Sequence, residues 1–446
     1  AEEFEGGAVF EPISGVREMV SVLDLKSLYP MSMTTINSSP ETKVGDPESY
    51  DGETFVAPNG LHYEKENDGI MREMIDELLS EREEKKRLRE EHEPGSQQYE
   101  LFDRQQASVK VIMNSLYGVT GWDRFRLYDK EGAAAVTATG RSVIDFTESV
   151  VNDLGYEVIY GDTDSVMISL GDDLGNENIE ISDDIKENRD DLTKSEQRQL
   201  QEAINKSFEI EEQINDAYDD YAKDEFNADE NRFQIEFEKL YRRFIQAGRK
   251  KRYGGHITWK EENHVDKIDI TGFEYQRSDI AEITKESQKK LIEMLVKGED
   301  LDDVKEYLVS VIDRFKNGDI PVGKVGIPGG IGKELNAYES TTAQVRGAKY
   351  ANMLLGTNFQ KGSKPKRVYL KRVDPSFYER IDMTPQENEL YADFKRDPDV
   401  ICFIHDEQVP NEFEVDWEKM LDKTLQAPLS RVLKAVELTW EDVKTG

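Results

Sequence analysis

Alternation of apolar and polar residues near the start of the chain predicts a β-strand. Residues 16–24 are rich in apolar side chains and lead directly into Asp24. Pro30 and the Ser, Thr, Asn and Pro residues of 32–40 interrupt this pattern. We therefore expect one strand that ends at an aspartate and is followed by a change of chain direction.

Helical spacing dominates the next part of the chain. An apolar stripe at helical spacing runs through residues 70–92. After a Pro-Gly turn at 94–95, a second helix is predicted over about 99–117, with Gly118 as its C-terminal cap. We expect the two helices to form an antiparallel hairpin, and a third helix to follow over about 131–154.

A strand–turn–strand pattern comes next. Mostly apolar segments, 157–160 and 165–168, flank a Gly-Asp-Thr-Asp turn at 161–164. Residues 171–232 are highly acidic and mostly helical in pattern, and residues 233–260 combine strand patterns with a basic cluster. The order of elements therefore predicts a mixture of helices and antiparallel strands.

Length and composition allow several folded parts. Beyond residue 270 the chain alternates helical patterns with Gly/Pro-rich loops such as 318–332. With 446 residues, 37% of them hydrophobic, two or three packed subdomains are expected. The chain contains no run of about 18 apolar residues, so no membrane span is predicted. Residues 1–3 match neither a signal peptide nor a start methionine, so we expect a cut or processed chain. Cys402 is the only cysteine, which excludes an internal disulfide and a multi-cysteine metal site.

Charge is the unusual feature of the composition. The chain has 93 acidic residues against 58 Lys and Arg, giving a formal net charge of −35. An acidic disordered protein is one interpretation, but the ordered apolar patterns favour a folded protein with an acidic surface suited to high salt. A nucleic-acid partner remains compatible with this charge, because positive residues cluster locally.

Three aspartates could meet at one site. Asp162 and Asp164 are two residues apart, so strand alternation would aim both at one place with Thr163 pointing away. Like charges so close favour a bound divalent cation. Asp24 ends a separate strand, and backbone N–H groups over 27–30 could hold phosphate oxygens. Taken alone, an Asp-Thr-Asp sequence is more typical of a solvated surface turn.

The predicted helical hairpin carries cations that could face one another. Lys110, Asn114 and Tyr117 share one helical face, and Arg82 and Lys86 are four residues apart on the other helix. Folding the hairpin could bring the three cations together, as a triphosphate requires. For the pair on the first helix, a solvated charged face is the ordinary alternative.

Three segments, in this order, resemble the polymerase motifs of family B DNA polymerases: residues 24–30 (DLKSLYP), 110–118 (KVIMNSLYG) and 160–165 (YGDTDS). Weaker resemblance to the same family extends over most of the chain, at residues 4–7, 236–239, 250–253, 272–279 and 338–349. The resemblance is greatest to archaeal members, and with the acidic composition it suggests a halophilic archaeon or its virus.

This resemblance implies an α+β right-hand polymerase fold, with an antiparallel palm sheet and helical-hairpin fingers. The implied domains are palm over 1–65, fingers over 66–118, palm again over 119–261 with an acidic insertion at about 171–232, and thumb over 262–446. The chain would be the polymerase portion alone, without the 3′–5′ exonuclease domain.

The implied activity is template-directed addition of dNTPs to a primer 3′-hydroxyl, with release of pyrophosphate, in DNA replication or repair. Asp24 and Asp164 would hold two Mg²⁺ ions, with Mn²⁺ as a substitute, together with the main chain at Leu25, and Asp162 would lie beside them. The implied partners are primer–template DNA and dNTPs, with a sliding clamp and the N-terminal exonuclease portion as further candidates and no membrane. The implied location is the cytoplasm.

The resemblance also assigns substrate contacts. Main-chain groups at Leu25, Ser27 and Leu28 would hold the β- and γ-phosphates, and Tyr29 would exclude a 2′-hydroxyl as the sugar gate. The nucleotide-binding set is Ser27, Leu28, Tyr29, Arg82, Lys86, Lys110, Asn114 and Tyr117. The DNA-binding set is Gly118, Thr163, Lys250, Lys251, Arg252, Tyr253 and Arg277. Lys251 would test base pairing from the minor groove without reading sequence.

Further charged residues have two interpretations each. Glu238, with Glu236, could add a carboxylate near the metals, or either could pair with Lys239 or Arg243. A third basic stretch could contact DNA phosphates, and consists of Lys361, Lys364, Lys366, Arg367, Lys371 and Arg372.

Three other functions compete with an active family B polymerase. A catalytically silent duplex-binding subunit would normally lose the metal carboxylates, which are present here. A reverse transcriptase would normally carry two adjacent aspartates in the turn. A polymerase piece that folds but binds DNA too weakly to act is compatible with the sequence.

Overall fold

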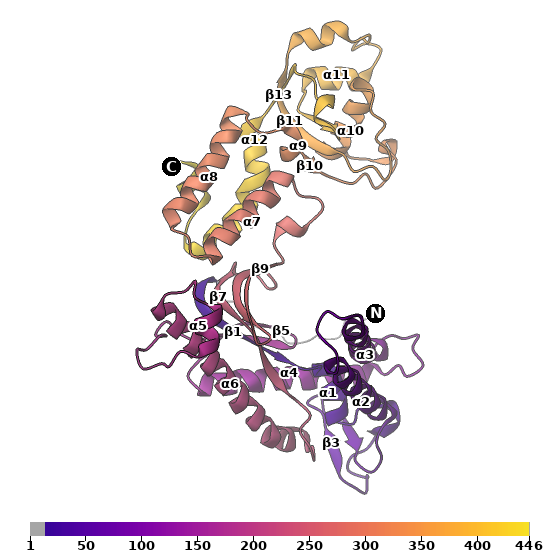
Figure 1. Cartoon of the computed structure of the whole chain (residues 1–446). Helices are drawn as coiled ribbons and strands as arrows, with labels where there is room; N and C mark the ends of the chain where they lie inside the picture. The colour runs from indigo at the N-terminus through magenta and orange to yellow at the C-terminus, as the bar shows by residue number, and fades with distance from the viewer. Residues whose placement is uncertain (1–13, 446) are drawn as a thin grey trace. The chain divides into compact units, whose positions relative to one another are not determined.

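The computed structural model describes residues 14–445, which divide into two compact units (Figure 1). The first unit contains Arg17–Arg242 and Ile257–Lys267, and the second contains Ser14–Val16, Arg243–His256 and the chain from Ile268 onward. The weak motif match at residues 4–7 lies outside the described residues. Among the described residues, no helix has both the length and the apolar character needed to span a bilayer.

A six-stranded sheet organises the strands of the first part of the chain, in the order β5-β6-β1-β7-β8-β9. β1 pairs antiparallel with β6, and Asp24 stands opposite Ser165 in that register. The predicted strand–turn–strand is confirmed as β5 and β6, which pair antiparallel. The strands are β1 (Gly15–Leu25), β5 (Glu157–Asp162), β6 (Ser165–Ser169), β7 (Ile235–Gln246), β8 (Tyr253–Lys260) and β9 (Asn263–Thr271).

Helices cover this sheet and bury its apolar side chains. α4 (Lys130–Asp153), predicted over about 131–154, packs against β5 and β6, and the 33-residue α6 (Lys194–Phe226) packs against α4 (Figure 1). The shorter α1 (Leu28–Thr35) contacts α4, and α5 (Asp183–Asn188) contacts α6. The acidic stretch is therefore helical, as expected. One face of α6 also belongs to the hydrophobic core, through Leu200, Ala203, Ile210, Ile214, Tyr218, Ala222 and Phe226.

The predicted helical hairpin is present as α2 (Ile70–Glu90) and α3 (Gln97–Thr120). Between them Gly95 takes a φ of 84°, and the Ser96 side chain caps α3 by accepting from the Tyr99 N–H at 3.2 Å. A small sheet precedes the hairpin, with order β2-β4-β3. Its strands are β2 (Lys43–Val44), β3 (Thr54–Val56) and β4 (His62–Glu64).

Gly118 does not end the second helix of the hairpin, so that prediction was wrong. α3 continues to Thr120 and its C-cap is Gly121. The last turn is held by burial of Leu116 and Thr120 and by a 2.6 Å hydrogen bond from the Thr120 hydroxyl to the Tyr117 carbonyl. This packing offsets the cost of a glycine inside a helix, about 1 kcal/mol.

The second unit contains a helical group and a separate sheet. α7 and α8 contact each other, α13 packs on α7, and α12 and α14 pack on α8. Its helices are α7 (Glu282–Val296), α8 (Leu301–Asn317), α9 (Val322–Val325), α10 (Ala343–Leu354), α11 (Glu389–Arg396), α12 (Trp417–Leu421), α13 (Ala427–Leu433) and α14 (Trp440–Lys444).

The sheet of the second unit was not predicted. β11 (Lys366–Val373) pairs with β10 (Ile327–Pro328), β12 (Val400–Phe403) and β13 (Phe413–Val415), all antiparallel. Its partner strands have two to four residues, which is too short for alternation to be recognised, and β11 itself is highly basic. Its Val368 is fully buried between helices and strands of the core.

One close approach in the second unit requires a glycine. Gly272 has a φ of 74°, and a Cβ built there would lie 1.7 Å from the Lys251 carbonyl oxygen. Lys251 itself has a φ of 61°, so the turn before β8 is shaped by this contact with the end of β9.

We predict that Gly272→Ala destabilises the protein by about 2 kcal/mol or more, because the new methyl group must displace backbone and the φ disfavours any side chain. Denaturant unfolding measures the change. Gly330→Ala is the control, since nothing lies within 4 Å of a Cβ at Gly330. Equal stability of the two variants would contradict the packing described here.

Candidate active site

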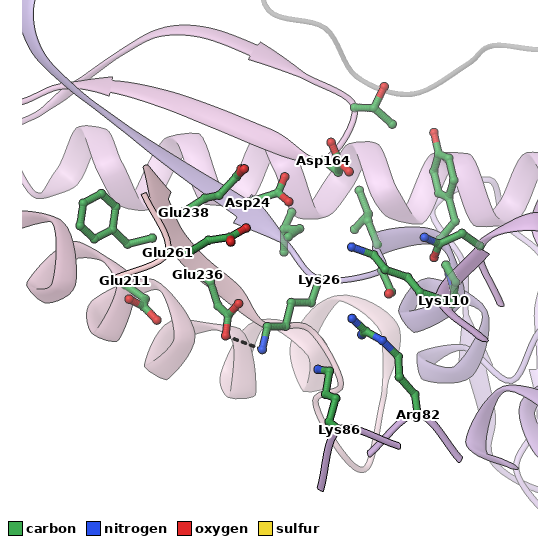
Figure 2. A pocket seen from close by; sticks show the side chains of 18 of the residues that line it. Asp24, Lys26, Arg82, Lys86, Lys110, Asp164, Glu211, Glu236, Glu238 and Glu261 are labelled. Atoms are coloured by element: carbon green, nitrogen blue, oxygen red, sulfur yellow. Dashed lines mark ion pairs between the residues drawn. The ribbon is translucent and has the colours of Figure 1, made fainter. Parts of the chain in front are cut away.

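A cavity of about 660 Å³ lies in the first unit. Its lining comes from the end of β1 and the start of α1, from both helices of the hairpin, from the β5–β6 turn, from α6, from β7 and from the β8–β9 turn. Carboxylates gather on one side and cations on the other (Figure 2). The cavity therefore joins segments that are far apart in the sequence.

Strand pairing places Asp24 beside Asp164. Asp24 is opposite Ser165 in the β1–β6 register, and the Leu25 N–H donates to the Asp164 carbonyl at 2.7 Å. The next N–H, of Lys26, donates to the Gln234 carbonyl at 2.9 Å. The end of β1 is thus fixed by main-chain bonds on two sides, and the two carboxylates lie next to each other (Figure 2).

The two carboxyl groups disfavour ionisation in the metal-free protein. Burial raises the pKa of Asp24 to about 7, and the negative charges of Asp164 and Glu238 add to the effect while Lys110 opposes it. The pKa of Asp164 is also raised, first by loss of surrounding water, although part of its side chain reaches solvent. Crowded carboxylates of this kind are relieved by a bound cation.

The donor set fits Mg²⁺. Within residues 14–445, no group of three or more His, Cys, Asp or Glu side chains forms a metal-binding cluster by itself. Mg²⁺ is commonly held by one or two carboxylates, and substrate phosphates and water complete its shell. Asp24 and Asp164, with an open cavity in front of them, meet that requirement.

Asp162 is placed differently from the expectation. It is the last residue of β5, and its carboxylate accepts a hydrogen bond from the Thr163 hydroxyl at 3.2 Å. Thr163 and Asp164 line the cavity, whereas Asp162 is absent from its lining. Strand alternation does not carry across these residues, because Thr163 has a φ of 29° and belongs to the turn. Asp162 still acts on the site through its charge, which raises the pKa of Asp164.

The segment after Asp24 begins helix α1 at the edge of the cavity. Ser27 adopts the left-handed conformation, φ 47° and ψ 52°, and is the N-cap of α1 without a side-chain capping bond. The first N–H groups of a helix have no partner within the helix, and they attract anions. Ser27, Leu28 and Tyr29 all line the cavity.

The hairpin supplies the cationic side of the cavity. Arg82 and Lys86 of α2, with Lys110 and Asn114 of α3, line it together. Burial lowers the pKa of Lys86, and the neighbouring charges of Arg82 and Lys26 lower it further. These positive charges therefore repel one another, and an anionic ligand between them would reduce the repulsion.

Tyr29 lies against Tyr117 and Gly140, of which only Tyr117 was among the predicted site residues. Its ring lies 4.4 Å from the ring of Tyr117, centroid to centroid, with a 38° tilt. A Cβ at Gly140 would come within 3.1 Å of the Tyr29 ring. Tyr117 supports Tyr29 and does not itself line the cavity.

Most of the predicted DNA-binding residues lie elsewhere. Arg277 pairs with Asp279 at 2.7 Å, and Arg252 lies 3.7 Å from the buried Glu274. Tyr253 packs near Phe244, with ring centroids 5.5 Å apart. Of the predicted set, only Thr163 lines the cavity, which leaves out Gly118, Lys250, Lys251, Arg252, Tyr253 and Arg277.

Part of the third basic stretch makes contacts within the protein. Lys366 donates to the Gly323 carbonyl at 2.8 Å, Arg367 to Gln344 at 3.2 Å, and Arg372 lies 3.0 Å from Glu414. Gln344, in turn, donates to the Gly329 carbonyl. These cations therefore have structural partners in the second unit.

The cavity also contains residues that sequence reasoning missed. Lys26 was passed over although it stands between two predicted site residues. Phe208 and Glu211 come from α6, in the acidic stretch that was interpreted as a salt-adapted insertion or, alternatively, a partner-binding surface. Glu261 and Glu262 come from the β8–β9 turn.

The two glutamates of β7 are part of the same site. Both Glu236 and Glu238 line the cavity. Glu236 forms an ion pair with Lys26, a partner that was not among the alternatives considered. Lys239 stands over the Tyr241 ring at 5.5 Å, and its charge opposes the rise in the pKa of Asp24. Glu238 acts on both Asp24 and Asp164, whose pKa values its charge raises.

Known proteins resemble this chain over most of its length. It is 29% identical over 410 residues to DNA polymerase 2 of Aeropyrum pernix, covering 91% of this chain and 44% of the relative. It is 30% identical over 330 residues to DNA polymerase 1 of Pyrococcus abyssi, covering 73% and 36%. Against the DNA polymerase delta catalytic subunit of Plasmodium falciparum, identity is 27% over 466 residues, covering 100% and 37%. The chain thus spans less than half the length of these relatives.

The fold is shared with a solved archaeal structure. The family B DNA polymerase of Pyrobaculum calidifontis matches with a TM-score of 0.65 at 24% identity, over 97% of this chain and 47% of that one. The model of DNA polymerase family B matches residues 1–196 and 192–436. These matches cover the β1, hairpin and β5–β6 segments that build the cavity, and the chain belongs to DNA polymerase family B.

Proposed function

We propose that this chain is a template-directed DNA polymerase that adds dNTPs to a primer 3′-hydroxyl. One observation carries the proposal: two crowded carboxylates, Asp24 and Asp164, face a wall of cations across a single cavity. Such a site suits a substrate that is a polyanion and brings its own metal ligands. Membership of the family and the names of its relatives agree with this reaction.

The domain assignment of the right hand extends this proposal. Strands β1 and β5–β8 of the six-stranded sheet would belong to the palm, over 1–65 and 119–261, and the α2–α3 hairpin would be the fingers, over 66–118. Residues 262–446, which begin with the sixth strand, β9, would be the thumb. The sheet order, the hairpin and the likeness to the Pyrobaculum calidifontis enzyme support it. We assign only the polymerase reaction to these residues, and no 3′–5′ exonuclease activity.

In the proposed mechanism, the site orients a primer terminus against a triphosphate. Asp24 and Asp164, with the main chain at Leu25, would hold two Mg²⁺ ions, which activate the 3′-hydroxyl and neutralise the phosphates. The 3′-hydroxyl loses its proton to solvent, its oxygen bonds to the α-phosphorus, the bond from that phosphorus to the bridging oxygen breaks, and pyrophosphate leaves. Asp162 contributes negative charge beside the metals.

The protein's own groups hold the nucleotide in line for this displacement. The open N–H groups at the start of α1, after Ser27, would bind β- and γ-phosphate oxygens, and Arg82, Lys86 and Lys110 would neutralise the remaining charge. Removal of mutual repulsion among these cations adds to the gain on binding. Tyr29 would pack against the deoxyribose.

We propose that the chain also contacts DNA outside the cavity. The basic run at 249–252, with Lys251 in its strained turn, would contact the primer–template duplex. The acidic surface would suit a halophilic, archaeal-like enzyme that works at high salt. Because phosphate contacts release counterions, high salt weakens the binding of DNA by most polymerases. Such an enzyme must bind DNA under these conditions. A sliding clamp and an exonuclease portion are proposed partners.

We predict that the wild-type chain extends a primer with Mg²⁺ and dNTPs and that Asp164→Asn lowers the rate by roughly 1,000-fold or more, because a metal ligand is weakened. Extension in a KCl series up to the molar range measures both claims. The exposed Asp172→Asn is the charge control. If the chain binds primer–template DNA but extends the primer at no salt concentration, it is better described as a catalytically silent subunit or as a polymerase piece that does not act alone.

Asp24→Asn should stabilise the metal-free protein while abolishing extension. The pKa of Asp24 is about 7 in the folded state against 3.8 as the reference, so the folded state binds more protons between these values. Stability from this group therefore falls as pH rises from about 4 to 7. At pH 8 with EDTA we expect Asp24→Asn to be more stable by about 2 kcal/mol.

Denaturant unfolding at pH 5 and pH 8, with EDTA or Mg²⁺, tests this expectation. The advantage of Asp24→Asn should shrink at pH 5 and in Mg²⁺, and Asp172→Asn should show no such pattern. A wild-type protein that is more stable than Asp24→Asn at pH 8 in EDTA would mean that the carboxylate already has a compensating partner.

Tyr29→Ala should admit ribonucleotides. Removal of the ring that packs on Tyr117 opens the cavity where a 2′-hydroxyl would lie. We expect discrimination between dNTP and rNTP, as a ratio of kcat/KM values, to fall by roughly 100-fold. The exposed Tyr128→Ala is the control. Unchanged discrimination, with extension intact, would remove the sugar-gate role from Tyr29.

A further inference from the structure

Lys26 occupies a position between the metal carboxylates and the phosphate-binding turn. Its main-chain N–H is tied to Gln234 at 2.9 Å, so the residue cannot shift along the strand. Its side chain lines the cavity and forms an ion pair with Glu236 (Figure 2). The two side chains are 44% and 45% exposed, so both can exchange partners without disturbing the core.

The Lys26 ammonium lies between a group of carboxylates, which attract it, and a pair of cations, which repel it. On one side, Lys26 forms an ion pair with Glu236, and its charge opposes the rise in the pKa of Glu211. On the other side stand Arg82 and Lys86, and the charge of Lys26 contributes to lowering the pKa of Lys86. Figure 2 shows the Lys26 side chain between the acidic residues and these cations. Lys26 therefore stands at the boundary between the acidic and the cationic side of the cavity.

A bound triphosphate would change the balance between these partners. An exposed ion pair between one ammonium and one carboxylate is weak and reversible. A phosphate oxygen of a metal-bound triphosphate is part of a polyanion and forms stronger charge-assisted hydrogen bonds. The same triphosphate would neutralise Arg82 and Lys86, which removes the repulsion that Lys26 meets on that side.

We propose that Lys26 is a positioning residue for the incoming nucleotide, held by Glu236 in the nucleotide-free enzyme and transferred to the triphosphate when a dNTP binds. This inference rests on the proposed polymerase function and deepens it. Glu236 serves as a holding group that keeps the ammonium away from Arg82 and Lys86 and close to the substrate. The ligand class is a nucleoside triphosphate, and the phosphate chain is the part recognised.

Equilibrium binding without chemistry gives the first test. The dissociation constant of a dNTP is measured with Mg²⁺ on a primer–template whose primer ends in a dideoxynucleotide. We expect Lys26→Ala to raise this constant about 10-fold, with Lys26→Arg within about 3-fold of wild type, since a lost charge-assisted contact weakens uniform binding. Lys85→Ala is the matched control, because Lys85 lies on α2 beside Lys86 and outside the cavity lining.

The role of Glu236 is tested by a double-mutant cycle on the same assay. Glu236→Gln should tighten dNTP binding about 2- to 3-fold in the wild-type background, because the competing partner is gone. In the Lys26→Ala background its effect should be distinctly smaller. In single-turnover extension of a normal primer, Lys26→Ala should raise the dNTP concentration that gives half-maximal rate about 10-fold, as expected for a residue that acts in binding.

Three results would overturn the proposal. Unchanged dNTP binding by Lys26→Ala would remove its contact with the phosphates. Equal effects of Glu236→Gln in both backgrounds would show that the pair is not a switch. A raised Mg²⁺ requirement in Glu236→Gln would make this residue a metal ligand instead. If the wild-type chain binds the dNTP on a terminated primer but fails to extend a normal primer, the polymerase proposal is wrong. The effect of Lys26→Ala on dNTP binding can still be interpreted in that case.

Discussion

The site depends on one backbone constraint, the pairing of β1 with the β5–β6 hairpin. Asp24 faces Ser165 across the strands, and the Leu25 N–H is bonded to the Asp164 carbonyl. These main-chain bonds hold two carboxylates together against their repulsion, at a raised pKa for both. A shift of one residue in this register would turn one carboxylate to the other face of the sheet. The sheet thus keeps the two carboxylates close despite their mutual repulsion, and a bound cation would relieve that repulsion.

The α2–α3 hairpin and the residue after β1 place positive charge opposite that acidic centre. Four cations, Lys26, Arg82, Lys86 and Lys110, line the cavity with the two aspartates. Neither group is fully compensated by the other, because the volume between them is open. In a chain with a net charge of −35, local placement of a few cations therefore decides what kind of ligand the cavity accepts.

Sequence reasoning predicted the local elements well and the long-range arrangement in part. Periodicity located β1, the α2–α3 hairpin, α4 and the β5–β6 turn, because each has a run of apolar residues long enough to show its period. It missed the sheet around β11, whose partners are only two to four residues long. It placed Thr163 away from the cavity, since alternation was extended through a turn residue with positive φ. Lys26 and Glu211 were missed because their role depends on charges brought near by folding, which no local pattern encodes.

Helix α6 joins two requirements in one element. Its buried face includes Ile210 and Tyr218, and its other side carries Phe208, whose ring meets Phe237 and Trp259 edge-on, and Glu211 at the cavity. Each residue inserted or deleted in an α-helix rotates the following part by about 100°. A change of length inside this helix would therefore move either the core residues or the cavity residues out of place. Acidic side chains can accumulate on its solvent face by substitution, whereas we expect changes in length to be tolerated only in the loops before Lys194 and after Phe226.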